Sequence, residues 1–176
     1  MSLTNDVPFT RIMAIDPSGN YTEGKGVTGY VEALLYEDGR LEYRDIGTIR
    51  ADKFPTKMAF WEAHMKLTLM YFDELVIEDY RLYNHQGSKA AMQTGSRLET
   101  PRLLGLLEFW AANNKVPITW QMASQTTAYN EDVLVARNIL KKQGSRYFLN
   151  GEKTNDHIRS ALKHLHRYLA NRKEKK

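Results

Sequence analysis

The chain has 176 residues, enough to fold as one domain with a sizeable core. Hydrophobic residues make up 42% of it and charged residues 26%, and no apolar run approaches the roughly 20 residues that cross a bilayer. With no cysteine, the sequence excludes a disulfide framework and a thiolate zinc site. It shows no secretory leader pattern, so we expect a cytoplasmic protein without a membrane segment. The net charge of +4 is compatible with nucleic acid but does not establish it.

The first fifty residues predict three strands that pair as antiparallel neighbours. An apolar run ends in the turn chemistry of Asp16-Pro17-Ser18-Gly19, and a hairpin signal follows at Glu37-Asp38-Gly39-Arg40. The expected strands cover residues 9–15, 30–36 and 41–49.

The rest of the chain alternates between helical and strand patterns. Between residues 57 and 72 the apolar residues that recur at helical spacing are Met58, Trp61, Met65, Leu69 and Phe72, which predicts an amphipathic helix with this stripe in the core. Glu74–Glu78 is a short apolar run typical of a covered sheet. The expected elements are a helix over 57–72, a strand over 74–78, a helical region over 88–113 interrupted near Thr100-Pro101, a strand over 116–120, and helices over 130–142 and 155–171. This order predicts an α/β fold with a five-stranded mixed sheet flanked by helices. We expect a single domain over 1–176, with its core over about 9–171 and a short basic tail.

Three acids stand where elements begin or end. Asp16 and Glu78 end two strands that should be neighbours, and Asp156 opens the last helix. Carboxylates gathered at one sheet edge repel each other, and a divalent cation such as Mg²⁺ or Mn²⁺ would neutralise them. The alternative for each is structural, because acids are common in turns and at helix starts.

The last helix carries further polar candidates. Its predicted core stripe is Ile158, Leu162, Leu165 and Leu169. The residues on one flank of that stripe are His157, Ser160 and His164, with Asp156 farther round and His166 among exposed positions. We expect His157 to face a site at the sheet edge, although a partly exposed surface histidine fits the pattern equally well. Two basic stretches, 141–146 and 172–176, also stand out, and the second is best interpreted as a solvated helix end.

Several of these segments together resemble the motifs of RuvC-like Holliday junction resolvases. The segment 15–19 (Ile-Asp-Pro-Ser-Gly), followed by Thr28-Gly29-Tyr30, is similar to the opening of that family, and Val76-Ile77-Glu78 to its second acidic motif. Gly87-Ser88-Lys89-Ala90 and Gly95, then Val116-Pro117, follow in the family's order. The segment 156–162 (Asp-His-Ile-Arg-Ser-Ala-Leu) resembles its last motif, so the likeness runs from about residue 11 to 169.

The resemblance implies a ribonuclease H-like fold, a homodimer, and hydrolysis of branched DNA such as a four-way junction with two divalent ions. It implies that Asp16 bridges the ions, that Glu78 ligates one, and that Asp156 or His157 completes the site or assists proton transfer. Basic and aromatic residues beyond the site would hold the phosphate backbone and stack on bases. The candidates for that DNA contact are Tyr80, Arg81, Tyr83, Lys89 and Arg97.

The sequence departs from the family pattern at two places. The loop between Gly19 and Thr28 is longer than in bacterial resolvases, which indicates a divergent and phage-type member. Ser160 stands where the family usually has its fourth acid. Either Asp156 compensates, or the site binds metal more weakly, or catalysis is impaired.

Three other functions stay open at this point. The first is another ribonuclease H-like nuclease, acting on RNA or on packaged viral DNA. The second is a junction-binding protein that has lost catalysis, for which Ser160 is the motivating feature. The third is a sugar-kinase-like ATPase, which ranks last because the chain is too short for the two domains that would enclose a nucleotide.

Overall fold

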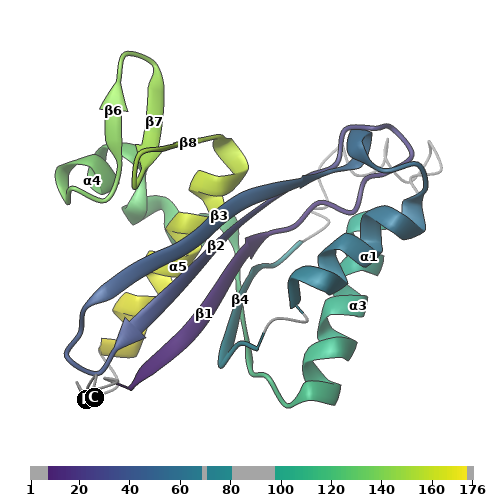
Figure 1. The fold of residues 1–176 in the computed structure, drawn as a ribbon, viewed down its shortest axis with the longest axis horizontal. Coiled ribbons are helices and arrows are strands. Elements are labelled where there is room, and N and C mark those ends of the chain that lie inside the picture. Colours follow the sequence, from purple (N-terminus) through teal and green to yellow (C-terminus); the bar gives the residue numbers. More distant parts are fainter. Residues whose placement is uncertain (1–7, 69–70, 81–97, 174–176) are drawn as a thin grey trace, which may run out of the picture.

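The computed structural model describes residues 8–68, 71–80 and 98–173, and its centre is a five-stranded sheet (Figure 1). The strands lie in the order β3-β2-β1-β4-β5. Pairing is antiparallel among β1, β2 and β3 and parallel from β1 to β4 and from β4 to β5, so the predicted mixed sheet is confirmed. The strands are β1 (Phe9–Asp16), β2 (Val27–Tyr36), β3 (Leu41–Arg50), β4 (Glu74–Glu78) and β5 (Ile118–Gln121).

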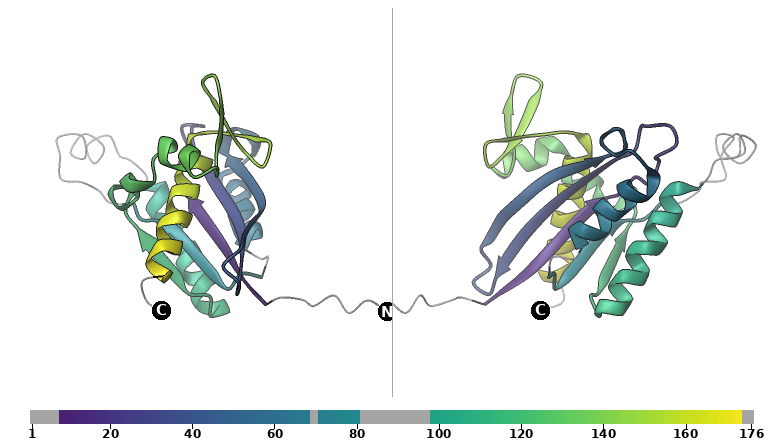
Figure 2. Two further views of the ribbon diagram at one scale, coloured as in Figure 1. Left: turned by 90° about the vertical axis from the view of Figure 1, so that its left-hand side faces the viewer. Right: turned by 45° about the vertical axis from the view of Figure 1, so that its right-hand side comes forward.

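Helices cover both faces of this sheet. Two views show α5 on one face and α1 with α3 on the other (Figures 1 and 2). The helical elements are η1 (Ala51–Lys53), α1 (Lys57–Thr68), α3 (Glu99–Asn114), η2 (Ala123–Tyr129), α4 (Glu131–Ala136) and α5 (Asp156–Lys173). Among the residues that the structure describes, no helix is long and apolar enough to span a membrane.

The alternation of side chains along β1 explains why the sheet has a core on each face. Ile12 and Ala14 pack into the cluster beneath α5, whereas Met13 and Ile15 pack into the cluster beneath α1 and α3. Successive residues of a strand point to opposite faces, so the next residue, Asp16, falls on the α5 face.

The helix predicted over 57–72 is shorter than expected and buries a different face. In the described residues α1 ends at Thr68, and Phe72 lies beyond it, buried in the core. Phe60 and Trp61 face the core, but the side chain of Met58 is 57% exposed. The predicted apolar stripe was therefore wrong at Met58, because large residues on both sides of a helix allow more than one choice of buried face.

The interruption expected at Thr100-Pro101 is a helix start. α3 begins at Glu99, preceded by Leu98 in the left-handed conformation with φ of 48°. A proline in the first turn is tolerated because its missing N–H would have no intrahelical partner there. The earlier part of that predicted helix lies outside the described residues.

The helix predicted over 130–142 is confirmed only in its first half. α4 ends at Ala136, and a three-stranded sheet follows, formed by β6 (Lys141–Gln143), β7 (Arg146–Leu149) and β8 (Glu152–Thr154) in the order β6-β7-β8. Asn150 and Gly151 both have positive φ and join β7 to β8 in a two-residue hairpin loop. Asn-Gly is the strongest short hairpin signal in a sequence, and it was overlooked here.

Candidate active site

Asp16 and Glu78 occupy matching positions at the carboxyl ends of two neighbouring parallel strands. Ile15 pairs with Ile77 in the β1–β4 register, so the residue that follows each lies at the same level of the sheet. Ala14 precedes Asp16 by two residues, and Val76 precedes Glu78 by two residues. Both Ala14 and Val76 pack beneath α5. The sheet therefore directs both carboxyl groups toward α5 at one edge.

The first three turns of α5 supply hydrogen-bond partners for both carboxyl groups. Nδ1 of His157 lies 3.0 Å from Oδ2 of Asp16. The hydroxyl of Ser160 donates to Oε2 of Glu78 at 2.9 Å, and Nε2 of His164 lies 3.1 Å from the same oxygen. Asp16 and Glu78 keep 18% and 22% of their side-chain surface exposed, so a substrate can approach them from solvent.

The pKa values of the two acids shift in opposite directions because their surroundings differ. Burial raises the pKa of Asp16, and the negative charge of Glu78 adds to this effect, while the hydrogen bond with His157 opposes it. Burial also opposes ionisation of Glu78, but hydrogen bonds from His164 and Ser160 outweigh it and lower the pKa of Glu78. The hydrogen bond with Asp16 raises the pKa of His157. The site thus holds two acids and a histidine that compete for protons.

Gly29 lets the start of α5 approach the sheet closely enough to bring His157 to Asp16. Gly29 pairs with Asp16 across β1 and β2. A Cβ built on Gly29 would lie 2.2 Å from the backbone carbon of His157, a distance at which the helix would have to move. The glycine of the Thr-Gly-Tyr segment therefore has a structural reason in this chain.

A chain of hydrogen bonds beneath the sheet fixes the turn that follows Asp16. The N–H of Ser18 donates to Oγ1 of Thr28 at 2.8 Å, and Oγ1 of Thr28 lies 2.7 Å from Nε2 of His64. Nδ1 of His64 donates to the carbonyl of Phe60 at 2.8 Å. Burial lowers the pKa of His64 to about 4, so this ring is neutral, and its Nε2 accepts a hydrogen bond from the Thr28 hydroxyl.

The loop after that turn is anchored by Glu99 at the start of α3. Its carboxylate accepts hydrogen bonds from the N–H groups of Tyr21 and Thr22 and from the Thr22 hydroxyl. Burial opposes its ionisation, but these donors outweigh burial and lower the pKa of Glu99. A Cβ on Gly19 would lie 2.2 Å from the Glu99 carbonyl oxygen, so α3 packs directly on the glycine of the turn. No role for Glu99 was predicted from the sequence.

The structure does not bring Asp156 together with the other candidates. Its side chain is 92% exposed and forms an ion pair with Arg159, one turn along α5. Adjacent residues of a helix point about 100° apart, so His157 faces the sheet edge while Asp156 faces solvent.

Of the five predicted DNA contacts, one lies among the described residues. Tyr80 is exposed and lies two residues beyond Glu78. The other four candidates, Arg81, Tyr83, Lys89 and Arg97, lie outside the described residues.

Two residues of the site, Gln121 and His164, were given no role from the sequence. Gln121 pairs with Glu78 in the β4–β5 register, and its Oε1 lies 3.1 Å from Nδ1 of the fully buried His164. Nε2 of Gln121 is buried and has no hydrogen-bond partner among the described residues. The spacing of His157, Ser160 and His164 on one helix flank was the available signal. His166, expected to be exposed, is instead half-buried against Tyr43, and burial lowers the pKa of His166 to about 4.

The donor set of this site suits one hard divalent cation. Asp16 and Glu78 offer carboxylate oxygens and His157 offers an imidazole nitrogen, and neighbouring carboxylates with competing pKa values are stabilised by a positive ion. In the side-chain arrangement of the described residues, Asp16 hydrogen-bonds with His157, and Glu78 hydrogen-bonds with Ser160 and His164. Among these residues no cluster of three or more His, Asp or Glu is arranged around a metal position. Ser160 offers no charge for a second ion.

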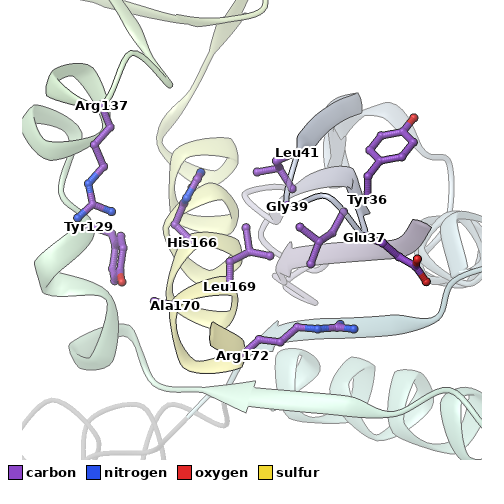
Figure 3. Close-up of a pocket in the computed structure, with 11 residues that line it drawn as sticks. Tyr36, Glu37, Gly39, Leu41, Tyr129, Arg137, His166, Leu169, Ala170 and Arg172 are labelled. Atoms are coloured by element: carbon purple, nitrogen blue, oxygen red, sulfur yellow. The ribbon is translucent and has the colours of Figure 1, made fainter. Parts of the chain in front are cut away.

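A separate cavity of about 420 Å³ lies at the opposite end of β1 (Figure 3). Tyr36, which pairs with the first residue of β1, lines it together with His166 and Arg172 from the second half of α5. Neither Asp16 nor Glu78 borders this cavity. The cavity is therefore separate from the candidate site at the sheet edge.

Comparison with known proteins supports the fold. The sequence matches no model of a protein family and no curated protein. The structure resembles that of Thermus thermophilus RuvC, with a TM-score of 0.63 and 14% identity over 94% of this chain and 97% of that chain. It also resembles T. thermophilus RuvC in complex with a Holliday junction substrate, with a TM-score of 0.60 and 15% identity over 93% and 96%. The chain therefore has a RuvC-like fold of the ribonuclease H type.

Proposed function

We propose that this chain is a metal-dependent endonuclease that cuts branched DNA and resolves Holliday junctions. One observation carries the proposal: Asp16 and Glu78 end neighbouring parallel strands in matching register, and His157 contacts the first of them. The likeness to a protein whose structure was solved with a Holliday junction substrate supports the choice of substrate. Carboxylates at one open sheet edge are the ligands that phosphodiester hydrolysis by Mg²⁺ or Mn²⁺ requires.

In this proposal Asp16, Glu78 and His157 hold the ion. When bound, a divalent cation stabilises negative charge on the scissile phosphate and lowers the pKa of an attacking water. Ser160 and His164 hold Oε2 of Glu78 and thereby orient its carboxylate toward Asp16. If His157 does not ligate the ion, it can instead carry a proton at the reacting phosphate, because Asp16 raises the pKa of this imidazole. A second ion would need a carboxylate that neither Ser160 nor the outward-facing Asp156 supplies.

A homodimer is part of the same proposal. A four-way junction has to be cut in two strands, and a two-fold dimer presents two identical sites for that purpose. The mass of the chain in solution, alone and with junction DNA, tests this arrangement.

The decisive experiment compares cleavage of a four-way DNA junction with cleavage of an RNA–DNA hybrid. We expect cuts in the junction with Mg²⁺ or Mn²⁺, none in excess chelator, and none from Asp16→Asn, which keeps the shape of the side chain but removes its charge. Cleavage of the hybrid alone would instead assign the chain to another class of ribonuclease H-like nuclease. Undiminished cleavage by Asp16→Asn or in chelator would overturn the metal mechanism.

A junction-binding protein without catalysis is the second candidate. The neutral Ser160 beside Glu78 favours it, because one acid fewer weakens the hold on metal. If the wild-type protein binds a four-way junction tightly but makes no cut at any Mg²⁺ or Mn²⁺ concentration, this second function would replace the first.

A further inference from the structure

The three-stranded sheet formed by β6, β7 and β8 stands out from the body of the molecule (Figures 1 and 2). It immediately precedes α5, the helix that carries His157 into the candidate site. Its first hairpin contains the basic stretch 141–146 of the sequence, all of it exposed. The proposed function has not used this stretch.

The register of the small sheet separates its residues into two faces. Tyr147 pairs with Thr154, and Leu149 with Glu152; Leu149 and Thr154 are buried, and Tyr147 packs against the core beneath α5. These residues define the inward face. Strand alternation therefore sends Phe148 to the opposite, outward face, and it is absent from both core clusters.

The outward face carries positive charge and no acid. Lys141 and Lys153 pair with Phe148 from its two sides, and Arg146 lies on the same strand as Phe148 two residues earlier, beside Gln143. The one acid of these strands, Glu152, belongs to the inward face.

None of the three outward cations forms an ion pair with an acid among the described residues. By contrast, the neighbouring Arg159 and Lys163 of α5 are both paired with Glu131. Cations that a protein leaves without a carboxylate partner on one projecting face are available to an external anion.

We propose that this outward face, formed by Lys141, Arg146 and Lys153, binds the phosphate backbone of a DNA arm leading away from the cleavage site. The inference rests on the proposed function and extends it to a substrate-holding surface. A narrow row of cations around one aromatic ring matches a line of phosphates. It lacks the broad apolar patch that a stable protein partner needs. Contacts of this kind fix position on the duplex without reading its sequence.

The test measures binding of a four-way DNA junction in excess chelator, so that cleavage does not interfere. The variant K141Q/K153Q removes two outward cations. The matched control, K66Q/K115Q, removes two exposed lysines from α1 and the end of α3, on the other face of the main sheet. Each pair lowers the net charge equally, and melting curves verify that all proteins fold.

We expect K141Q/K153Q to weaken binding about tenfold or more at roughly 0.1 M salt, and to reduce the slope of log K against log salt by about 2. The control should retain most of the wild-type affinity and slope, and linear duplexes of unrelated sequence should show the same difference. Equal losses in both variants, or none in K141Q/K153Q, would overturn this surface and leave the nuclease proposal intact. Failure of the wild type to bind any junction would overturn the proposed function itself.

Discussion

Each face of the main sheet buries a histidine, but the histidines on the two faces make different kinds of hydrogen bond. Beneath α1, His64 donates to a backbone carbonyl and accepts from Thr28, so its hydrogen bonds end within the protein. Beneath α5, His164 and His157 are directed at Glu78 and Asp16, carboxylates that remain partly open to solvent. A buried polar network that is closed on itself holds a turn in place, whereas one that ends on exposed acids prepares a site.

The largest effect is expected from removing the charge of an acid on the α5 face. Glu78→Gln should reduce cleavage of a four-way junction by roughly a thousandfold or more, because it removes one of the two carboxylates available to a cation. Asp156→Asn makes the same chemical change on an exposed side chain that pairs with Arg159, and it should leave the cleavage rate within a few-fold of wild type. A large loss of cleavage in Asp156→Asn would show that Asp156 takes part in the site.

On the α1 face we expect an effect on stability. His64→Ala removes a buried ring and its two hydrogen bonds, and it should lower the free energy of unfolding by about 2–4 kcal/mol. Met58→Ala, on the same helix but exposed, should cost less than about 1 kcal/mol. Urea denaturation of both variants checks the difference. Similar values for the two would show that His64 is not part of a closed network.

The histidines of the two faces should also respond to pH in opposite directions. In the folded chain the pKa of His64 is lowered from its ordinary value of 6.5 to about 4. Below pH 6.5 the unfolded chain therefore binds a proton that the folded chain does not. As the pH is lowered from 6.5 to 4, the free energy of unfolding decreases by up to about 1.4 kcal/mol per pH unit.

The pKa of His157 is raised, so its contribution to stability is complete below the unfolded pKa and is lost as the pH rises through the folded value. Imidazole proton resonances separate the two: at about pH 5.5 we expect His64 to be neutral and His157 to be charged. Resonances that titrate together near pH 6.5 would contradict the assignment.

The smallest expected effect concerns the serine beside Glu78. Ser160→Asp replaces a hydroxyl donor with a carboxylate, so without metal it should destabilise the chain by about 1–2 kcal/mol. With metal, the added ligand should lower the Mg²⁺ concentration for half-maximal cleavage several-fold. Melting curves and cleavage rates across a Mg²⁺ titration measure both. A Mg²⁺ requirement that stays the same would indicate that Ser160 is not a metal-facing position.

The sequence predicted the five strands of the main sheet because they are short apolar runs with clear ends. Asp16 and Glu78 were recognisable since each follows such a run directly, and strand alternation then determines the face. The core stripe of the last helix was also predicted: Ile158, Leu162 and Leu165 are buried.

What the sequence left undetermined depends on contacts between distant segments. The choice between Asp156 and His157 is decided by the rotation of α5 about its axis, which the contact with Gly29 fixes. Gln121 joins the site only through the register of β4 with β5. The β6–β8 sheet was overlooked because the apolar spacing around Leu140 also fits a helix. In the folded chain α4 ends at Ala136, and Asn138 follows with a positive φ of 58°.

The site residues lie far apart along the chain, and this has a consequence for folding during synthesis. Asp16 and His157 are separated by 141 positions, and Glu78 and His164 by 86. Long-range contacts of this kind form late, after the entropy of closing the intervening loops has been overcome. A growing chain therefore has its acids in place on β1 and β4 well before α5 emerges to complete their surroundings. Any nuclease activity would begin only when this helix packs onto the finished sheet, so incomplete chains would not cut DNA.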